Sequence, residues 1–164
     1  MQTDLIERTP EAYPYPLLIK NLLVSSLATT PDQEIVYREL RRHSYRDFYE
    51  RVCRLAAALE ALGVKRGDTV AIMDWDSHRY LEAFFAVPMM GAVLQTVNVR
   101  LNPEQILYTF NHARPKVALV NSEFFDVLGV IHDRLESVET FVLISDEPAP
   151  PQAPVAMAGE YEAL

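Results

Sequence analysis

The amino-acid sequence predicts an α/β fold in which a parallel sheet is flanked by helices, preceded by an N-terminal arm, a helix and a β-hairpin. Three observations predict it. Short runs of β-forming residues alternate with helices that carry an apolar stripe, the links between them are short, and polar residues able to cap a helix stand at the helix starts. Strands that alternate with single helices over short links favour right-handed crossovers and a parallel sheet.

The first part of the chain predicts an arm, a helix and a hairpin. Residues 1–16 contain three prolines, so we expect an extended arm rather than a regular element. Residues 17–28 are apolar enough for a partly buried helix, which Pro31 closes. The run EIVYRELRRHSY then predicts two short strands around a turn near Glu39 to Arg41.

A strong helix follows the hairpin. Ser44 and Asp47 have the spacing of a capping box, in which each side chain satisfies a free backbone N–H of the other residue. Gly63 is placed to end this helix as a left-handed cap. The apolar positions fall on one face, at Phe48, Val52, Leu55, Leu59 and Leu62.

The βα alternation begins after the turn at Gly67-Asp68. Residues 69–73, TVAIM, predict a strand buried on both faces. Ser77 is placed to cap a helix over 77–91, and residues 93–99 predict the next strand. The apolar stripe of this helix comprises Tyr80, Leu81, Phe84 and Phe85.

The alternation continues to residue 145. Asn102 caps the next helix, with Pro103 at its first position, where a missing N–H costs nothing. Arg114-Pro115 ends that helix, and residues 116–121 predict a strand. Ser122 is expected to cap a further helix before a last strand at 140–145. The apolar residues of these two helices are Ile106, Leu107, Phe110 and Ala113, then Phe124, Leu128, Ile131 and Leu135.

The composition changes at residue 146. Residues 146–164 hold four prolines and four acids, so we expect a linker or a frayed C-terminus. The chain then divides into an arm at 1–16, an α/β unit at 17–145 and this C-terminal segment.

Composition excludes several classes of protein. The 164 residues carry 23 acids against 15 bases, a net charge of -8 that argues against a nucleic-acid partner. One cysteine excludes a disulfide scaffold, and the five glycines never approach the spacing of GxGxxG or GxxxxGK. The polar first residues and a longest apolar run of twelve residues, 83–94, give no signal peptide and no membrane span. We therefore expect a cytoplasmic protein.

The basic stretch at residues 38–66, with eight bases against four acids, has two interpretations. A solvated helix face is favoured over a patch that faces phosphates. Cys53 lies in the helix after Ser44, where a small core or boundary side chain is favoured over a nucleophile because no base is adjacent in sequence.

The histidines do not form a metal motif in the sequence. His43, His78, His112 and His132 have no histidine partner at i+3 or i+4, and we expect no Cys or Glu to complete a site. His78 lies near Asp74 and Asp76, so a metal or catalytic cluster is one interpretation. A capped helix start with a surface histidine is favoured over it.

The ends of two predicted strands supply candidates for a pocket or an interface. Asp74 and Asp76 would face the crevice at the carboxyl ends of the strands, or would cap the next helix. Trp75 would fill an interface or a pocket wall. Asn98 and Arg100 occupy the equivalent place after the second strand, where a structural ion pair of the arginine is favoured over a contact with a phosphate or carboxylate. The candidates are Trp75, Asp76, His78, Asn98 and Arg100.

Several words of the sequence resemble one superfamily. SYRDFYERVCRLAAALEALGVKRGDTVAIM is similar to the opening of adenylate-forming (AMP-binding) synthetases, which include acyl-CoA synthetases, luciferases and peptide-synthetase adenylation domains. DSHRYLE, FFAVPMMGAVL, NVRL, PEQI and NHA follow in the order and spacing of medium- and long-chain fatty-acyl-CoA synthetases. The resemblance covers about residues 15–145 and implies an incomplete N-terminal subdomain of such a ligase.

The resemblance implies a two-step reaction in the complete enzyme. ATP and a fatty acid would give an acyl-adenylate, and coenzyme A would then displace AMP, with Mg²⁺ neutralising charge at the phosphates. This chain has no loop of the type TSGTTGxPKG, and Lys20, Lys65 and Lys116 match no catalytic context of the family. We therefore expect no catalytic, ATP-binding or metal residue and no cofactor in this chain alone, which would be inactive.

Two other functions stay open. In the first, the chain is a binding or assembly module that has the fold of the synthetases but does not catalyse their reaction. In the second, it is the start of an enzyme that adenylates aryl acids or amino acids. The partner would be the missing C-terminal part of the synthetase or a second copy in a homodimer, because a sheet cut from its covering layers leaves apolar surface exposed. Helix 77–91 is the expected contributor, through Phe84, Phe85, Val87, Met89 and Met90.

Overall fold

The computed structural model describes residues 9–13 and 15–164. The arm predicted for 1–16 therefore lies largely outside the described residues. The helices and strands that follow are α1 Ile19–Thr29, β1 Glu34–Tyr37, β2 Arg41–Ser44, α2 Tyr45–Ala61, β3 Thr69–Met73, α3 His78–Met89, β4 Val93–Thr96, α4 Pro103–Ala113, β5 Val117–Asn121, α5 Phe125–Ile131 and β6 Thr140–Ile144.

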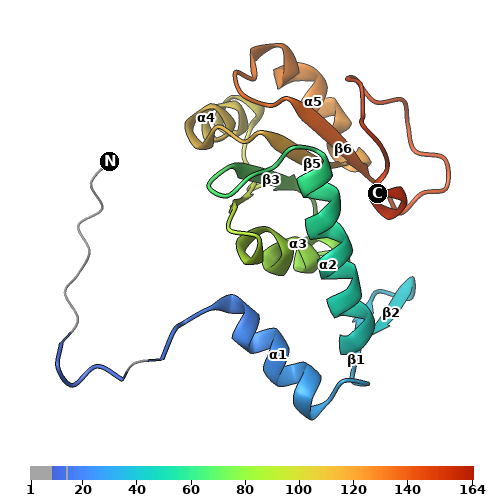
Figure 1. The fold of residues 1–164 in the computed structure, drawn as a ribbon. Coiled ribbons are helices and arrows are strands. Elements are labelled where there is room, and N and C mark those ends of the chain that lie inside the picture. The colour runs from blue at the N-terminus through green and yellow to red at the C-terminus, as the bar shows by residue number, and fades with distance from the viewer. Residues whose placement is uncertain (1–8, 14) are drawn as a thin grey trace.

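The predicted parallel sheet and hairpin are confirmed. Strands β1 and β2 form a separate antiparallel pair, while the main sheet has the order β4-β3-β5-β6 with every neighbouring pair parallel (Figure 1). Central strands β3 and β5 are aligned so that Val70 lies opposite Val117 and Met73 opposite Val120. Their carboxyl ends therefore meet at one edge of the sheet.

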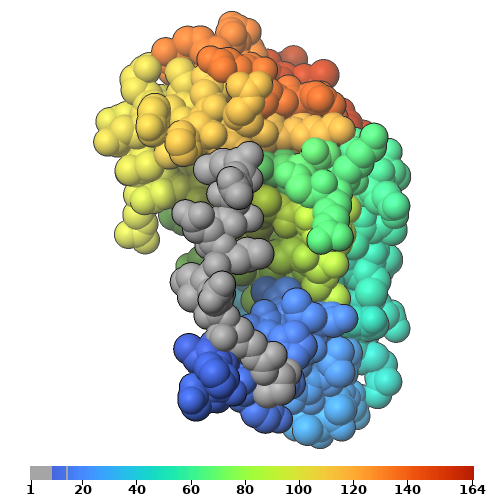
Figure 2. Space-filling view, turned by 60° about the vertical axis from the view of Figure 1, so that its left-hand side comes forward, coloured from blue at the N-terminus to red at the C-terminus, as the bar shows by residue number. Residues whose placement is uncertain are grey.

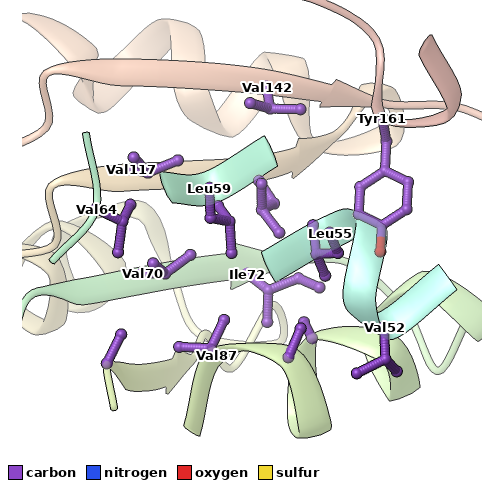
Figure 3. Close-up of a cluster of buried hydrophobic side chains, with 14 of the residues drawn as sticks. Val52, Leu55, Leu59, Val64, Val70, Ile72, Val87, Val117, Val142 and Tyr161 are labelled. Carbon is purple, nitrogen blue, oxygen red and sulfur yellow. The ribbon is translucent and has the colours of Figure 1, made fainter. Parts of the chain in front are cut away.

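Helices cover both faces of this sheet. Helices α2 and α3 lie on one side and α4 and α5 on the other (Figure 1). Side chains alternate along each strand, so Val70 and Ile72 join the α2–α3 core whereas Ala71 and Met73 join the α4–α5 core. Figure 3 shows the first core, with Leu59 above β3 and Val87 below it. The central strands are buried on both faces, as their apolar sequences predict.

Helix α2 follows its predicted phase. The Ser44–Asp47 capping box is present, with the Asp47 N–H donating to Ser44 Oγ at 3.1 Å and the Ser44 N–H donating to Asp47 at 2.9 Å. Gly63 adopts the left-handed φ of 85° that ends the helix. The buried face is Phe48, Val52, Leu55 and Leu59, whereas Leu62 is the half-buried C-cap.

Several boundaries differ from the prediction. Asn121 rather than Ser122 caps the turn before α5, because its side chain accepts the Glu123 N–H while the Ser122 hydroxyl donates to Ser145. Strand β4 ends at Thr96, although the Val97 N–H still donates to the Ile72 carbonyl. Val87, expected on the exposed side of helix 77–91, is fully buried.

The C-terminal residues do not fray. Leu143 and Glu160 form a parallel bridge beside β6, and Tyr161 is 7% exposed in the α2–α3 core. In Figure 3 its ring enters this core from the side of the C-terminal segment. The compositional change at residue 146 thus marks a change from regular to irregular structure that still packs on the fold. The division of the chain into three segments stays a prediction.

The N-terminal helix and hairpin lie at one end of the molecule. In Figure 2 the blue residues of α1 lie at the bottom, and the yellow and orange residues of α4 and α5 lie at the top. Helix α1 buries Leu23 against α2 and α3 but exposes Leu22 and Val24. The hairpin packs beside the start of α2, and this position brings His43 of β2 next to α3.

Candidate functional site

The carboxyl edge of the sheet is closed by hydrogen bonds. Asp74 follows β3 and is 3% exposed. Its carboxylate accepts hydrogen bonds from the Ser77 hydroxyl and from Asn121 Nδ2, the latter at 2.7 Å. Burial raises the pKa of Asp74, and these two donors oppose that rise. Asp74 therefore fastens β3 to β5 and to the start of α3, which is closer to the predicted capping role than to a catalytic pair with Asp76.

Trp75 and Asp76 point to different surroundings. The half-buried Trp75 ring lies 5.1 Å from the Phe124 ring, and its Nε1 donates to Glu123 at 2.9 Å. Asp76 is exposed and lines an open hollow of about 360 Å³ together with residues of β1 and α3. Trp75 thus packs against the turn before α5, on the α4–α5 side of the sheet.

Asn98 and Arg100 form a separate local turn. The Arg100 backbone N–H donates to Asn98 Oδ1 at 3.1 Å, and both side chains are exposed. Arg100 has no ion pair with any residue in the described part of the chain, so the structural ion pair that the sequence favoured is not formed there. The candidates from the two strand ends are therefore not joined into one site by hydrogen bonds.

His78 is buried, contrary to the prediction of a surface histidine. Only 3% of it is exposed, because β1 and β2 cover the first turn of α3. Its Nε2 lies 3.2 Å from Glu162 Oε1, and the same carboxylate accepts hydrogen bonds from Arg79 at 2.8 Å and from Arg51 at 2.9 Å. The hydrogen bonds from His78 and Arg51 outweigh burial and hold the pKa of Glu162 well below its usual range.

Glu82, one turn further along α3, is the most buried of the acids in the described residues. It is 1% exposed and pairs with Arg51 of α2 in a bidentate ion pair, with N–O distances of 2.6 and 3.2 Å. The Tyr161 hydroxyl donates to it at 2.7 Å. Burial and the Glu82 charge together raise the pKa of Tyr161 well above its ordinary value. Helices α2 and α3 and the C-terminal turn are thus tied at one point.

Arg79 extends these contacts to the end of β6. Its guanidinium donates to Asp146 Oδ1 at 2.8 Å and to the Ser145 carbonyl at 3.0 Å. Asp146 also accepts the Tyr37 hydroxyl of β1 at 2.7 Å, and burial together with this bond raises the pKa of Tyr37 to about 12. The network therefore links α2, α3, β1 and the segment after β6.

Two histidines and a glutamate converge beside this network. The rings of His43 and His78 lie 5.4 Å apart, and ligand atoms of His43, His78 and Glu82 lie within 4.8 Å of one another. The expectation that no glutamate completes a histidine site is wrong, because Glu82 follows His78 by four residues on one helix face. That spacing was the signal in the sequence. His43 arrives from the hairpin, and no sequence pattern indicated it.

The remaining candidates lie elsewhere. Cys53 is exposed on α2 rather than buried, because it falls outside the apolar face of that helix. His112 is exposed, and His132 contacts the Gly129 carbonyl at 3.1 Å. The arrangement of the histidine pair supports ion pairing, proton binding or metal coordination. No helix in the described part of the chain is long and apolar enough to cross a membrane.

Comparison with known proteins gives a consistent result. The model of the family described as "AMP-binding enzyme" matches residues 23–163. The chain is 44% identical over 122 residues to a long-chain-fatty-acid–CoA ligase of Thermus thermophilus, covering 72% of this chain and 22% of the relative. It is 37% identical over 107 residues to a medium-chain-fatty-acid–CoA ligase of Ectopseudomonas oleovorans, covering 65% of this chain and 20% of the relative.

The structural comparison agrees with the sequence comparison. A crystal structure of a putative long-chain-fatty-acid CoA ligase from Rhodopseudomonas palustris superposes with a TM-score of 0.75 at 27% identity, covering 89% of this chain and 35% of that one. The chain spans about a fifth of the length of the two curated relatives that it matches.

Proposed function

The chain belongs to the AMP-binding enzyme family, and we propose that it is the N-terminal subdomain of a fatty-acid–CoA ligase. The observation that carries this proposal is the 44% identity to the Thermus long-chain-fatty-acid–CoA ligase. The fatty-acid branch is favoured over aryl and amino-acid activation by that relative and by the medium-chain ligase.

The complete enzyme would join a fatty acid to coenzyme A through an acyl-adenylate, using ATP and Mg²⁺. We assign this chain the role of a scaffold in that reaction. Its buried arginines, Arg51 and Arg79, are held by the carboxylates of Glu82, Glu162 and Asp146 inside the fold, which supports a structural role rather than phosphate binding. Charge stabilisation at the phosphates would come from groups outside these 164 residues.

An exchange assay tests the scaffold role from one side. The 164-residue chain alone should catalyse no ATP–pyrophosphate exchange with any fatty acid. ATP–pyrophosphate exchange activity that co-purifies with the folded monomer or oligomer of this chain would contradict the proposal. The Thermus ligase serves as the active control.

A segment exchange tests it from the other side. Residues 23–163 should replace the matching segment of the Thermus ligase with fatty-acid-dependent exchange retained, because the two share 44% identity over most of this segment. A control chimera that also carries Asp74→Ala loses the hydrogen bond from Asn121 at the end of β5 to Asp74 at the end of β3. It should be less stable than the unsubstituted chimera. A chimera that folds but is inactive would favour the binding-module alternative, particularly if the isolated chain bound ATP or fatty acid in a titration.

A further inference from the structure

Two imidazole nitrogens are buried without a partner. Among the described residues, the buried side-chain atoms that lack a hydrogen bond are His43 Nε2, His78 Nδ1 and the amide oxygen of Gln95. Buried polar atoms are nearly always satisfied, so each exception needs a physical explanation. Two of the three belong to histidines whose rings lie 5.4 Å apart, which indicates one shared cause.

We propose that His43, His78 and Glu82 bind a divalent transition-metal ion of the zinc type. The three residues supply one ligand atom each within 4.8 Å of one another. Two imidazoles and one carboxylate are a donor set that Zn²⁺ takes with a fourth position left open. The site lies between the hairpin and α3, apart from the hydrogen bonds that close the sheet edge.

The hydrogen bonds around His78 prepare it as a ligand. Glu162 is an ionised acceptor held by Arg51 and Arg79, so His78 Nε2 must carry the proton that it shares with Glu162. A ring with its one proton on Nε2 keeps the Nδ1 lone pair for an ion. Histidines that ligate metals commonly donate their second N–H to a carboxylate in this way, which fixes the tautomer.

Glu82 retains capacity for one more bond. An ionised carboxylate has about four lone-pair positions, and Arg51 and Tyr161 occupy three of them. An ion at the remaining position would leave the Arg51 pair intact. Arg51 and Tyr161 would then orient Glu82 as Glu162 orients His78.

The three ligand atoms must move slightly closer together to bind an ion, and an open hollow beside His78 gives the ion access. A tetrahedral zinc ion holds donors about 3.4 Å apart, so donors that lie within 4.8 Å of one another must approach by up to about 1.4 Å. The hairpin supplies that freedom, since His43 is half-buried on an outer two-stranded sheet. The hollow of about 360 Å³ lined by Tyr37, Ser77 and His78 gives an entry path.

The charges select the ion. The three acids of this network, Glu82, Asp146 and Glu162, are balanced by three arginines, so an added dication has no surplus of negative charge to attract it. The arginines are Arg38, Arg51 and Arg79. Hard ions such as Mg²⁺ and Ca²⁺ depend on oxygen ligands and would be excluded. Ions that favour neutral imidazole, such as Zn²⁺, Co²⁺ and Ni²⁺, fit this donor set.

Metal titration of the 164-residue chain at neutral pH is the test. Zn²⁺ should bind one ion per chain by calorimetry, and His43→Gln or His78→Gln should weaken binding by at least about tenfold. The matched controls His112→Gln and His132→Gln should bind as the unsubstituted chain does, because these histidines lie elsewhere. Mg²⁺ should give no heat of binding. Co²⁺ should give the intense visible absorption of a tetrahedral ion.

A second measurement does not depend on variants that fold. In the unsubstituted chain, Zn²⁺ should shift the NMR resonances of His43 Nε2 and His78 Nδ1 and leave those of His112 unchanged. Zinc binding that survives the double substitution of His43 and His78, or a titration that leaves both nitrogens unshifted, would overturn the proposal. A water molecule shared by the two rings would then account for the unpartnered atoms.

Discussion

Helix α2 makes two kinds of contact that hold the molecule together by different means. One face packs Val52, Leu55 and Leu59 against the sheet. At the edge of that face, Arg51 instead joins α3 and the C-terminal turn through Glu82 and Glu162. The first contact is apolar and spread over many atoms, whereas the second rests on a few charged groups in fixed geometry.

This contrast predicts how each contact fails. An apolar contact loses free energy in proportion to the atoms removed and the cavity left behind. A buried ion pair fails abruptly when one partner is removed, because the other charge stays buried without compensation, yet replacing both partners costs little. The following predictions, from the largest expected effect to the smallest, are designed to break or sharpen the contrast.

Removing Arg51 alone should have the largest effect. Arg51→Met leaves the Glu82 carboxylate 1% exposed and without its cation, so the free energy of unfolding should fall by about 3–5 kcal/mol in urea denaturation. The double variant Arg51→Met/Glu82→Met should recover a large part of this loss. Effects that simply add in the double variant would show that the pair behaves like the apolar contact.

Truncating a leucine on the apolar face of α2 should lower the free energy of unfolding by nearly as much as removing Arg51 does. Leu59→Ala or Leu55→Ala should lower the free energy of unfolding by about 2–5 kcal/mol, because both side chains are buried. Leu22→Ala in α1, where the leucine is 66% exposed, is the control and should change it by less than about 0.5 kcal/mol. A similarly small change at Leu55 would mean that the phase of α2 is wrong.

Acid should weaken the polar contact in two stages. Burial, Arg51 and His78 lower the pKa of His43 below 6.5, so the unfolded chain takes up that proton first, and stability should decline as pH falls from 6.5. Glu162 has a pKa depressed below 4.5, so its contribution is present above pH 4.5 and lost below it. Urea midpoints measured against pH should show both stages, and His43→Gln should remove only the upper one.

Substituting an exposed apolar residue should have the smallest effect, and this effect should be on the free energy of self-association. Phe84 and Leu81 of α3 are 41% and 36% exposed, and Val36 of the neighbouring hairpin is 50% exposed. We predict a homodimer or higher oligomer of the isolated chain, detected by sedimentation equilibrium at micromolar concentration. Phe84→Ser should shift the equilibrium toward monomer. A strict monomer that binds no apolar-surface dye would refute this prediction.

The sequence was sufficient for the sheet and its helices because local signals coincided there. The Ser44–Asp47 box, Asn102-Pro103 and the apolar run 69–73 each predict one structure, and the protein adopts it. The cap before α5 was misplaced by one residue, because Asn121 and Ser122 are both able to cap and the Ser122 hydroxyl instead bonds to Ser145, a contact that is not local.

The candidate site was predicted less well, because its contacts are not local. Trp75, Asp76, Asn98 and Arg100 follow strands, as catalytic residues in parallel sheets do, but they adopt local turns or pack against neighbours. His43 meets His78 across 35 residues, and Glu162 meets it across 84. Pairing over such separations depends on tertiary geometry that periodicity and capping do not encode.

The link between Glu162 and α3 has a consequence for biosynthesis. A nascent chain presents Arg51, His78 and Arg79 long before residue 162 leaves the ribosome, since these partners are separated by 83 to 111 residues. Until then Arg51 and Arg79 have only their earlier partners Glu82 and Asp146, and Tyr161 cannot complete the α2–α3 core. Co-translational folding of the α2–α3 core should therefore finish only after residues 161 and 162 emerge, which makes these two residues a checkpoint on its assembly.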